Sequence, residues 1–163
     1  MIIELYEQHF FSIRTDMLLC PTVPSGLTDE AVELGFDRVH PEIATAVREA
    51  SELNDMPAGV LMCLRAENSS QKELLVGVPM SPHSREPLSP YYLHLAIRSL
   101  RQLINEQGVK RVTIPINCFC ELDKKEKNDD YHGIKSVTKY TLIKELMFLE
   151  ASLYDDVEFI LVH

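Results

Sequence analysis

The sequence contains no tryptophan, only six glycines, and only 16 lysines and arginines against 25 aspartates and glutamates. The resulting formal charge of −9 makes duplex nucleic acid an unfavourable partner, because an acidic surface repels the phosphate backbone. Long apolar runs are missing too, since the run ending at Val162 is far shorter than the roughly 20 residues of a membrane helix. Residues 1–10 carry two glutamates and no lysine or arginine, unlike a secretory signal. We therefore expect a cytoplasmic protein without a membrane partner.

Cysteine is also scarce, and its spacing argues against a metal site. Of the four cysteines only Cys118 and Cys120 lie near each other, and a lone C-x-C lacks the second ligand pair of a zinc centre. We expect reduced thiols, no metal and no cofactor. With 163 residues, 45% of them apolar, the chain is long enough for one domain that buries about 68–70% of its unfolded surface.

Short apolar runs separated by turn residues predict the strands. Residues 17–20 have the pattern of a buried central strand, and Pro21 is expected to end it because proline cannot donate to a sheet ladder. Residues 59–64 and 74–78 predict an antiparallel hairpin. Further strands are predicted at residues 2–6, 10–13, 111–116 and 157–162.

Helix signals stand between these runs. Ser89 has the position of an amino-terminal cap, apolar residues then recur at spacings of four, three and four, and Gly108 marks the end of this helix. Another helix is expected to begin at Pro41, and Gly35 is expected to interrupt the helix before it. The last helix is predicted at residues 140–152.

Alternating strands and helices of this kind predict an α/β protein. We expect a three-layer α/β/α sandwich around a mixed six-stranded sheet, because the hairpin makes the sheet only partly parallel. A single domain is expected over residues 1–163, with a charge-rich polar insertion at about 121–139 that lies in solvent.

Four segments, taken in order, resemble the macro domain. Residues 16–21, Asp-Met-Leu-Leu-Cys-Pro, look like the buried strand of that family, and residues 26–36 look like its first loop running into a helix. Residues 40–42, His-Pro-Glu, resemble the Phe-Pro-Glu that begins the next helix, and residues 108–115 resemble the strand before the second phosphate-contacting loop. The pattern is most similar to the branch that contains DNA ADP-ribosyl glycohydrolase antitoxins. The resemblance implies a macro-domain fold with an ADP-ribose cleft beside these loops.

Against the same family this chain shows clear differences. Cys20 stands where the family commonly has an asparagine near the distal ribose, and Asp29 and Glu30 stand where its first loop has small residues. A carboxylate beside a diphosphate would repel it, by about 1 kcal/mol for each close pair of charges in water. Residues 117–121 contain no glycine, and Ser81 stands where the antitoxin branch has a catalytic lysine. These differences favour binding without hydrolysis and leave the catalytic residues unknown.

The candidate ligand-binding residues are those that the resemblance places beside the cleft. Phe119 has two interpretations, as a ring that stacks on a base or a nicotinamide and as a ring packed into the core. Arg85 pairs either with a phosphate or with one of the many surface carboxylates. The candidates are Cys20, Pro21, Gly26, Leu27, His83, Arg85, Asn117, Cys118, Phe119 and Cys120.

Three functions are open from the sequence. The leading hypothesis is a divergent macro-like domain that binds an ADP-ribose relative or another nucleotide metabolite without hydrolysing it. The second is an ADP-ribosyl hydrolase whose chemistry has moved to Arg85 or His83. The third is a pseudo-enzyme that binds a protein partner through the insertion at 121–139. A patch for single-stranded nucleic acid would require four residues to lie together: Arg98, Arg101, Lys110 and Arg111.

Overall fold

The computed structural model describes residues 1–23, 26–27, 30–53, 61–66, 73–79, 89–119 and 137–163. The strands of the described part are β1 (Ile2–Leu5), β2 (Met17–Val23), β3 (Gly26–Leu27), β4 (Met62–Ala66), β5 (Glu73–Pro79), β6 (Arg111–Pro115) and β7 (Glu158–Val162). They form a seven-stranded sheet in the order β1-β7-β6-β2-β5-β4, and β3 pairs with β2 outside that path.

The sheet is mixed, as the sequence predicts. β2 runs parallel to β5 and β6, and β7 runs parallel to β6 and β1. β4 pairs antiparallel with β5, with Met62 beside Gly77 and Ala66 beside Glu73, which confirms the expected hairpin. Six strands lie on one path, and the short β3, antiparallel to the end of β2, adds a seventh that the sequence analysis did not predict.

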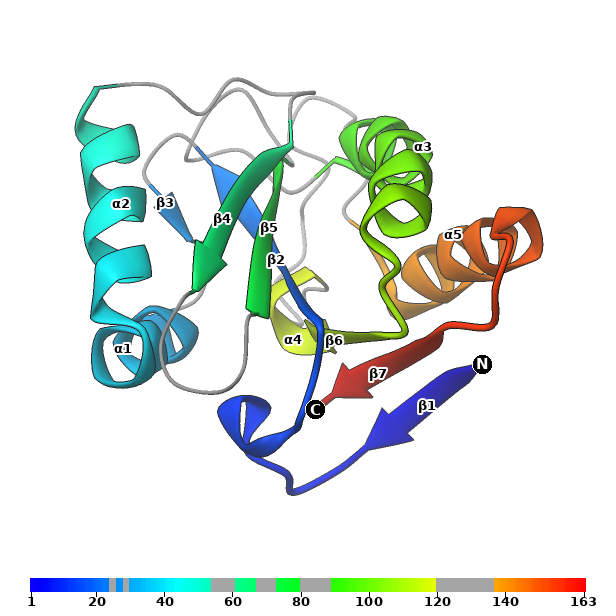
Figure 1. The fold of residues 1–163 in the computed structure, drawn as a ribbon, viewed down its shortest axis with the longest axis horizontal. Helices are drawn as coiled ribbons and strands as arrows, with labels where there is room; N and C mark the ends of the chain where they lie inside the picture. The colour runs from blue at the N-terminus through cyan, green and yellow to red at the C-terminus, as the bar shows by residue number, and fades with distance from the viewer. Residues whose placement is uncertain (24–25, 28–29, 54–60, 67–72, 80–88, 120–136) are drawn as a thin grey trace, which may run out of the picture.

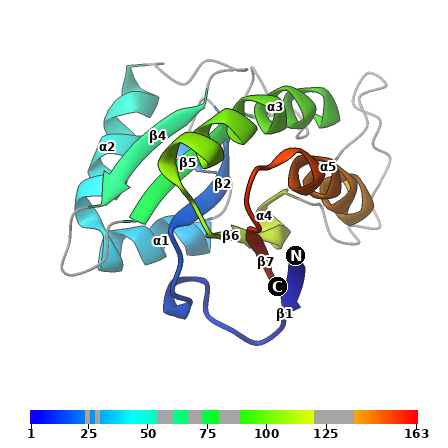
Figure 2. The same cartoon turned by 45° about the vertical axis from the view of Figure 1, so that its right-hand side comes forward.

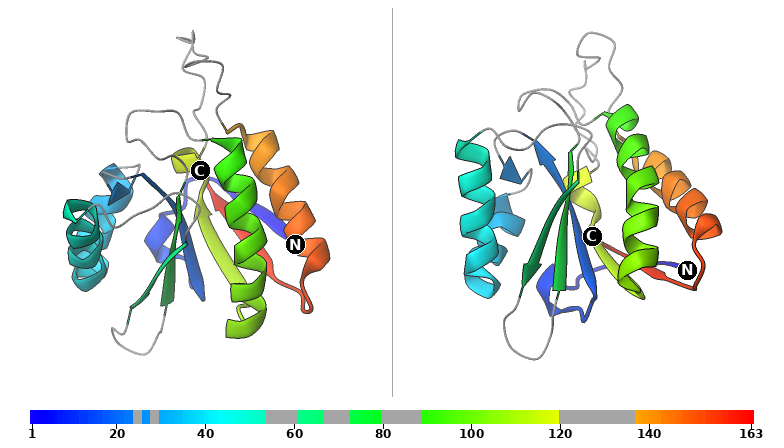
Figure 3. Two further views of the ribbon diagram at one scale, coloured as in Figure 1. Left: turned by 90° about the horizontal axis from the view of Figure 1, so that it is seen from above. Right: turned by 45° about the horizontal axis from the view of Figure 1, so that its top comes forward.

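Among the described residues, four helices of ten or more residues cover the sheet: α1 (Glu30–Val39), α2 (Pro41–Glu52), α3 (Pro90–Gln107) and α5 (Lys139–Ser152). α1 and α2 lie on one side of the sheet and α3 and α5 on the other (Figures 1 and 2), and Figure 3 shows the sheet between the two pairs. The expected α/β/α sandwich is confirmed. Two short elements also occur, η1 (Phe10–Ser12) and α4 (Ile116–Phe119). Among the described helices, none is long and apolar enough to cross a membrane.

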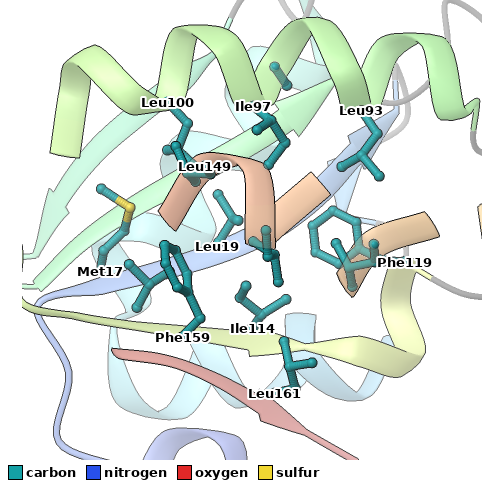
Figure 4. Packing of buried hydrophobic residues seen from close by; sticks show 14 of the residues in the cluster. Met17, Leu19, Leu93, Ile97, Leu100, Ile114, Phe119, Leu149, Phe159 and Leu161 are labelled. Carbon is teal, nitrogen blue, oxygen red and sulfur yellow. The ribbon is translucent and has the colours of Figure 1, made fainter. Parts of the chain in front are cut away.

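Each face of the sheet buries its own hydrophobic cluster. On the α3–α5 face, Leu19 of β2 and Phe159 of β7 belong to one cluster with Leu100 of α3 (Figure 4). On the α1–α2 face, Leu18 of β2 is buried in a second cluster with Phe36 of α1. Leu18 and Leu19 point to opposite faces because side chains alternate along a strand. Burial on both faces explains the uninterrupted apolar run in β2.

The predicted ends of α3 are confirmed. Ser89 Oγ accepts a hydrogen bond from the Tyr91 N–H over 3.3 Å, and Gly108 has a φ of 63°, in the left-handed region. Glycine is favoured there because a Cβ atom would be strained. α2 likewise begins at Pro41, where the missing N–H costs nothing because the first turn has no partner for it.

The strand predicted at residues 10–13 is wrong, because Phe10–Ser12 forms the 3-10 turn η1. The Phe11 N–H donates to His9 Nδ1, and the Ser12 N–H donates to the His9 carbonyl. Phe10 is buried, and the Phe11 ring packs edge-on against Phe36 of α1 with a centroid distance of 4.9 Å. The apolar residues of this segment therefore anchor a turn against α1 instead of pairing in the sheet.

Gly35 does not interrupt α1, which continues through it to Val39. A Cβ atom on Gly35 would lie 2.1 Å from a ring carbon of Phe11, whereas carbon atoms in contact lie about 3.5–4.0 Å apart. The residue is therefore a glycine because an aromatic ring packs directly on the helix backbone. The prediction of a helix break was wrong because this ring comes from a distant part of the sequence.

Pro21 does not end β2 either, since the strand runs on to Val23. On one side Pro21 lies beside Val78 of β5, and on the other side the pairing of β2 with β6 has already stopped at Leu18. Proline is tolerated in a strand where one flank has no ladder partner. This partial pairing is a property of the sheet and could not be read from the local sequence.

Residues 137–139, the last part of the polar insertion predicted at about 121–139, belong to the packed fold. Val137 is only 1% exposed, and Thr138 Oγ1 caps α5 by accepting a hydrogen bond from the Thr141 N–H over 3.1 Å. Lys139 is already the first helical residue. Residues 121–136 lie outside the described residues.

Candidate functional site

The carboxyl ends of five parallel strands meet at one edge of the sheet. β2 pairs with β5 from Met17 to Thr22 but with β6 only at Met17 and Leu18. β2 and β6 therefore separate toward this edge. Open α/β sheets bind ligands outside the carboxyl ends of their strands, where neighbouring strands part. This place, the β2–β6 edge, is the candidate site.

The first predicted ligand segment lies on β2 and β3. Cys20 is 1% exposed and Pro21 is also buried, so neither presents its side chain to solvent. Gly26 and Leu27 form β3, which turns back and pairs with the last two residues of β2. α1 then begins at Glu30, so its amino terminus lies close to the same edge. The structure thus brings this segment to the β2–β6 edge through its backbone.

The second predicted segment is helical, where the sequence analysis expected a loop. Ile116 follows β6 directly and begins α4. Asn117 is exposed and Cys118 is half-buried, whereas Phe119 is fully buried in the cluster on the α3–α5 face (Figure 4). The interpretation of Phe119 as a stacking residue is therefore wrong, and its packing interpretation is right. Asn117 is the exposed candidate of this turn.

Three further candidates lie outside the described residues: His83, Arg85 and Cys120. The same is true of Asp29 and Ser81. The roles assigned to all five from the resemblance stay predictions.

A polar cluster that the sequence analysis missed lies at the ends of β1 and β7. His163 Nε2 is 3.1 Å from Glu4 Oε1, and the His163 ring stacks on Tyr6 with centroids 4.0 Å apart. Lys139 pairs with the same Glu4 carboxylate. The hydrogen bond from Lys139 and the bond to His163 lower the pKa of Glu4, and Glu4 in turn raises the pKa of Lys139. No sequence signal links positions 4 and 163, which meet only because β1 pairs with β7.

At the opposite, amino edge of the strands lies a hollow of about 640 Å³. Several of its charged side chains are engaged in bonds within the fold: Asp16 Oδ2 accepts the backbone N–H groups of Lys110 and Arg111 at 2.8 and 3.1 Å. Arg111 Nε donates to Glu158 Oε2 over 2.8 Å, and Lys110 Nζ pairs with Asp155. These bonds tie the starts of β2, β6 and β7 together. The hollow is accordingly a structural feature of the sheet, and Lys110 and Arg111 serve as its ties.

The described groups at the β2–β6 edge can bind a polar ligand. They are backbone N–H and C=O groups, the Asn117 amide and the half-buried Cys118 thiol. No set of three histidine, cysteine or acidic side chains comes close enough to hold a metal ion within the described ranges. Elsewhere, burial raises the pKa of the Cys63 thiol on β4, which keeps that thiol protonated and weakly nucleophilic.

No protein-family model matches the chain, and no curated protein matches it. Among solved structures, the macrodomain of Mycobacterium tuberculosis DarG aligns with a TM-score of 0.76 at 18% identity, over 99% of this chain and 97% of that one. The macrodomain of Thermus aquaticus DarG aligns with a TM-score of 0.68 at 16% identity, over 100% and 98%. Thermosipho africanus DarTG in complex with ADP-ribose aligns with a TM-score of 0.59 at 12% identity, over 98% and 41%. At identities this low, the structural alignments establish the shared fold alone.

Proposed function

Because the chain has the macrodomain fold, we propose that it binds an ADP-ribose-related nucleotide at the β2–β6 edge. The observation that supports this most is the backbone arrangement there: β2 parts from β6, β3 turns back on β2, and α1 begins shortly after β3. The Thermosipho africanus DarTG structure, which has this fold, was solved with ADP-ribose bound.

The amino terminus of α1 suits the phosphates of such a ligand. The first N–H groups of a helix have no partner within the helix, and the helix dipole adds partial positive charge at that end. A site built from backbone donors is well suited to a chain whose formal charge is −9, because these donors attract phosphate at short range. By the resemblance, Glu30 stands where the first loop of the family has a small residue, and a carboxylate there would act against a diphosphate. We therefore expect Glu30→Gln to tighten binding of ADP-ribose.

The test is calorimetric titration with ADP-ribose, NAD, AMP and adenosine, supported by melting curves. At 100 times its dissociation constant a ligand adds about 2.7 kcal/mol of stability. For a chain of this size that amount raises the melting temperature by roughly 5–10 °C. We expect such a shift with ADP-ribose. No heat and no shift with any of the four compounds would refute the proposal and leave the protein-partner hypothesis.

Two matched pairs of variants place the ligand. Glu30→Gln should bind ADP-ribose about five-fold more tightly, the effect of removing one nearby like charge in water, while Glu49→Gln on α2 should leave affinity unchanged. Asn117→Ala should weaken binding by roughly three- to ten-fold, the range for one lost hydrogen bond, and Gln102→Ala on α3 is its control. Equal effects from a variant and its control would place the ligand elsewhere.

We further propose that binding proceeds without hydrolysis. The support is the resemblance, in which Ser81 stands where the antitoxin branch has its catalytic lysine. The protein should release no ADP-ribose from an ADP-ribosylated oligonucleotide or protein. Release that Arg85→Ala abolishes would instead establish the hydrolase hypothesis with its relocated chemistry.

A further inference from the structure

A groove of about 480 Å³ lies between α3 and α5, and its lining includes no residue of the strands and turn that form the β2–β6 edge. Its apolar lining includes Ile97 of α3 and Leu149 of α5, both almost fully buried. Phe148 of α5 also lines the groove and is 64% exposed. The two helices lie side by side in Figures 1 and 3. The groove therefore combines an apolar floor with an aromatic side chain open to solvent.

α5 carries apolar side chains on more than its core-facing side. Leu142 and Leu146 point into the core, yet Tyr140, Met147 and Phe148 are each more than half exposed. A surface helix normally places polar residues on its outer side. Nine large apolar side chains are exposed among the described residues, and four of them belong to α5 and the turn after it. Of these four, Phe148 lies in the groove lining, and an exposed aromatic ring beside an apolar floor is the kind of surface that marks an interaction site.

Positive charge surrounds the groove in a chain that is acidic overall. Arg98, Arg101 and Lys144 line it and are exposed, and within the described part of the chain none of the three pairs with a carboxylate. The one carboxylate of the lining, Glu145, is held by His94, whose Nδ1 lies 3.1 and 3.2 Å from its two oxygens. The groove thus presents three cations on the surface of a chain whose formal charge is −9.

We propose that this groove docks an acidic, amphipathic helix of a partner protein. The apolar side of that helix would cover Phe148 and the floor, and its carboxylates would meet the three cations. Lining residues from Lys144 to Ser152 span about 12 Å of α5, enough for roughly two turns of a partner helix. A second copy of this chain fits less well, because it would bring a whole body of charge −9 against another, whereas a short helix brings only the few carboxylates that meet the three cations. A nucleic acid, with a charge on every phosphate, would likewise bring more negative charge than the groove can pair.

The test uses a labelled peptide of about 14 residues designed as a helix, with leucines at positions i, i+3, i+4 and i+7 and glutamates on both flanks. A reference peptide has lysine at every glutamate position. In fluorescence anisotropy with the full chain at low salt, the acidic peptide should bind saturably. The lysine peptide should bind at least about ten-fold more weakly, because several exposed ion pairs are replaced by repulsion. Absence of saturable binding, or equal binding of both peptides, would overturn the proposal.

Two matched pairs of variants locate the binding. Phe148→Ser should weaken the acidic peptide about ten-fold, as loss of an interface anchor does, while Met147→Ser, equally exposed but outside the groove lining, should not. Arg101→Glu should weaken it about five-fold or more, while Arg38→Glu on α1, with the same change of charge, should not. Equal losses within a pair would overturn the proposal.

Two further measurements test a nucleic acid and a second copy of this chain as occupants of the groove. A 10-nucleotide single strand that binds and is weakened by Arg101→Glu would identify a nucleic-acid surface instead. Sedimentation that shows a dimer of the wild type, dissociated by Phe148→Ser, would identify a second copy as the occupant. We expect a monomer and no binding of the oligonucleotide. The melting temperature of every variant serves as the check on folding.

Discussion

Replacing Gly35 with alanine should destabilise the protein, although alanine is the better helix former. Gly35 lies inside α1, and alanine in a helix interior is favoured over glycine by about 1 kcal/mol. The added Cβ atom, however, would lie 2.1 Å from Cε2 and 2.7 Å from Cδ2 of the Phe11 ring. Atoms this close cannot remain in place, so the ring must move.

Moving the ring is costly because Phe11 is held between two other aromatic rings. It makes edge-on contacts with Phe10 and Phe36, each with a centroid distance of 4.9 Å. Such pairs contribute about 0.5–1.5 kcal/mol each beyond their buried area, and overpacking costs about 1–3 kcal/mol. Against the helix gain of about 1 kcal/mol, the net loss for Gly35→Ala should be about 1–2 kcal/mol. The melting temperature should fall by roughly 3–6 °C.

The decisive assay is a double-mutant cycle measured by urea denaturation. In the Phe11→Ala background the ring is gone, so Gly35→Ala should stabilise the protein by about 1 kcal/mol. The effect of Gly35→Ala on the free energy of unfolding therefore has opposite signs with and without the Phe11 ring. If Gly35→Ala were neutral or stabilising in the presence of Phe11, the contact between η1 and α1 would not be formed as described, and the argument for this glycine would fail.

Three other predictions concern stability. The pKa of Glu4 is lowered by Lys139 and His163, so the charged carboxylate stabilises the fold at pH values above its ordinary pKa of 4.5. This stabilisation is lost as the pH falls through the lowered pKa. Melting curves should therefore show Glu4→Gln to be less stable than the wild type at pH 7, with the difference closing in acid. Asp16→Ala removes the acceptor of two backbone N–H groups at the start of β6 and should cost about 1–2 kcal/mol in urea denaturation, and an unchanged midpoint would contradict this. Ser89→Ala should cost about 1 kcal/mol, whereas Ser89→Asp should retain most of the stability as an alternative cap.

Local signals in the sequence were sufficient to predict most helices and strands. The cap at Ser89, the glycine at Gly108 and the proline at Pro41 act through the backbone within a few residues, so their effect can be read without knowing what packs nearby. The order of such elements was enough to predict the α/β/α sandwich, and the matched segments, such as residues 16–21 and 108–115, added the resemblance to the macro domain. The approximate position of the candidate site followed from the same order, because parallel strands bring their carboxyl ends to one edge.

Where the sequence analysis failed, partners distant in the chain decided the outcome. Pro21 stays within β2 because β6 has left its flank, and residues 10–13 pack as a turn because Phe36 offers them an aromatic surface. Phe119 is buried because α4 turns it into the cluster under α3, which no spacing in its own segment indicates.

Composition, apolar periodicity and capping residues by themselves determined that this chain folds as an α/β sandwich, because these signals act over a few neighbouring residues. Only the tertiary structure decided which side chains are exposed at the β2–β6 edge and which face the core. It also brought Glu4 to His163, and it gathered three cations around the groove of α3 and α5 in an acidic protein. These arrangements depend on contacts between residues far apart in the chain, and such contacts exist only once the sheet and its helices have packed.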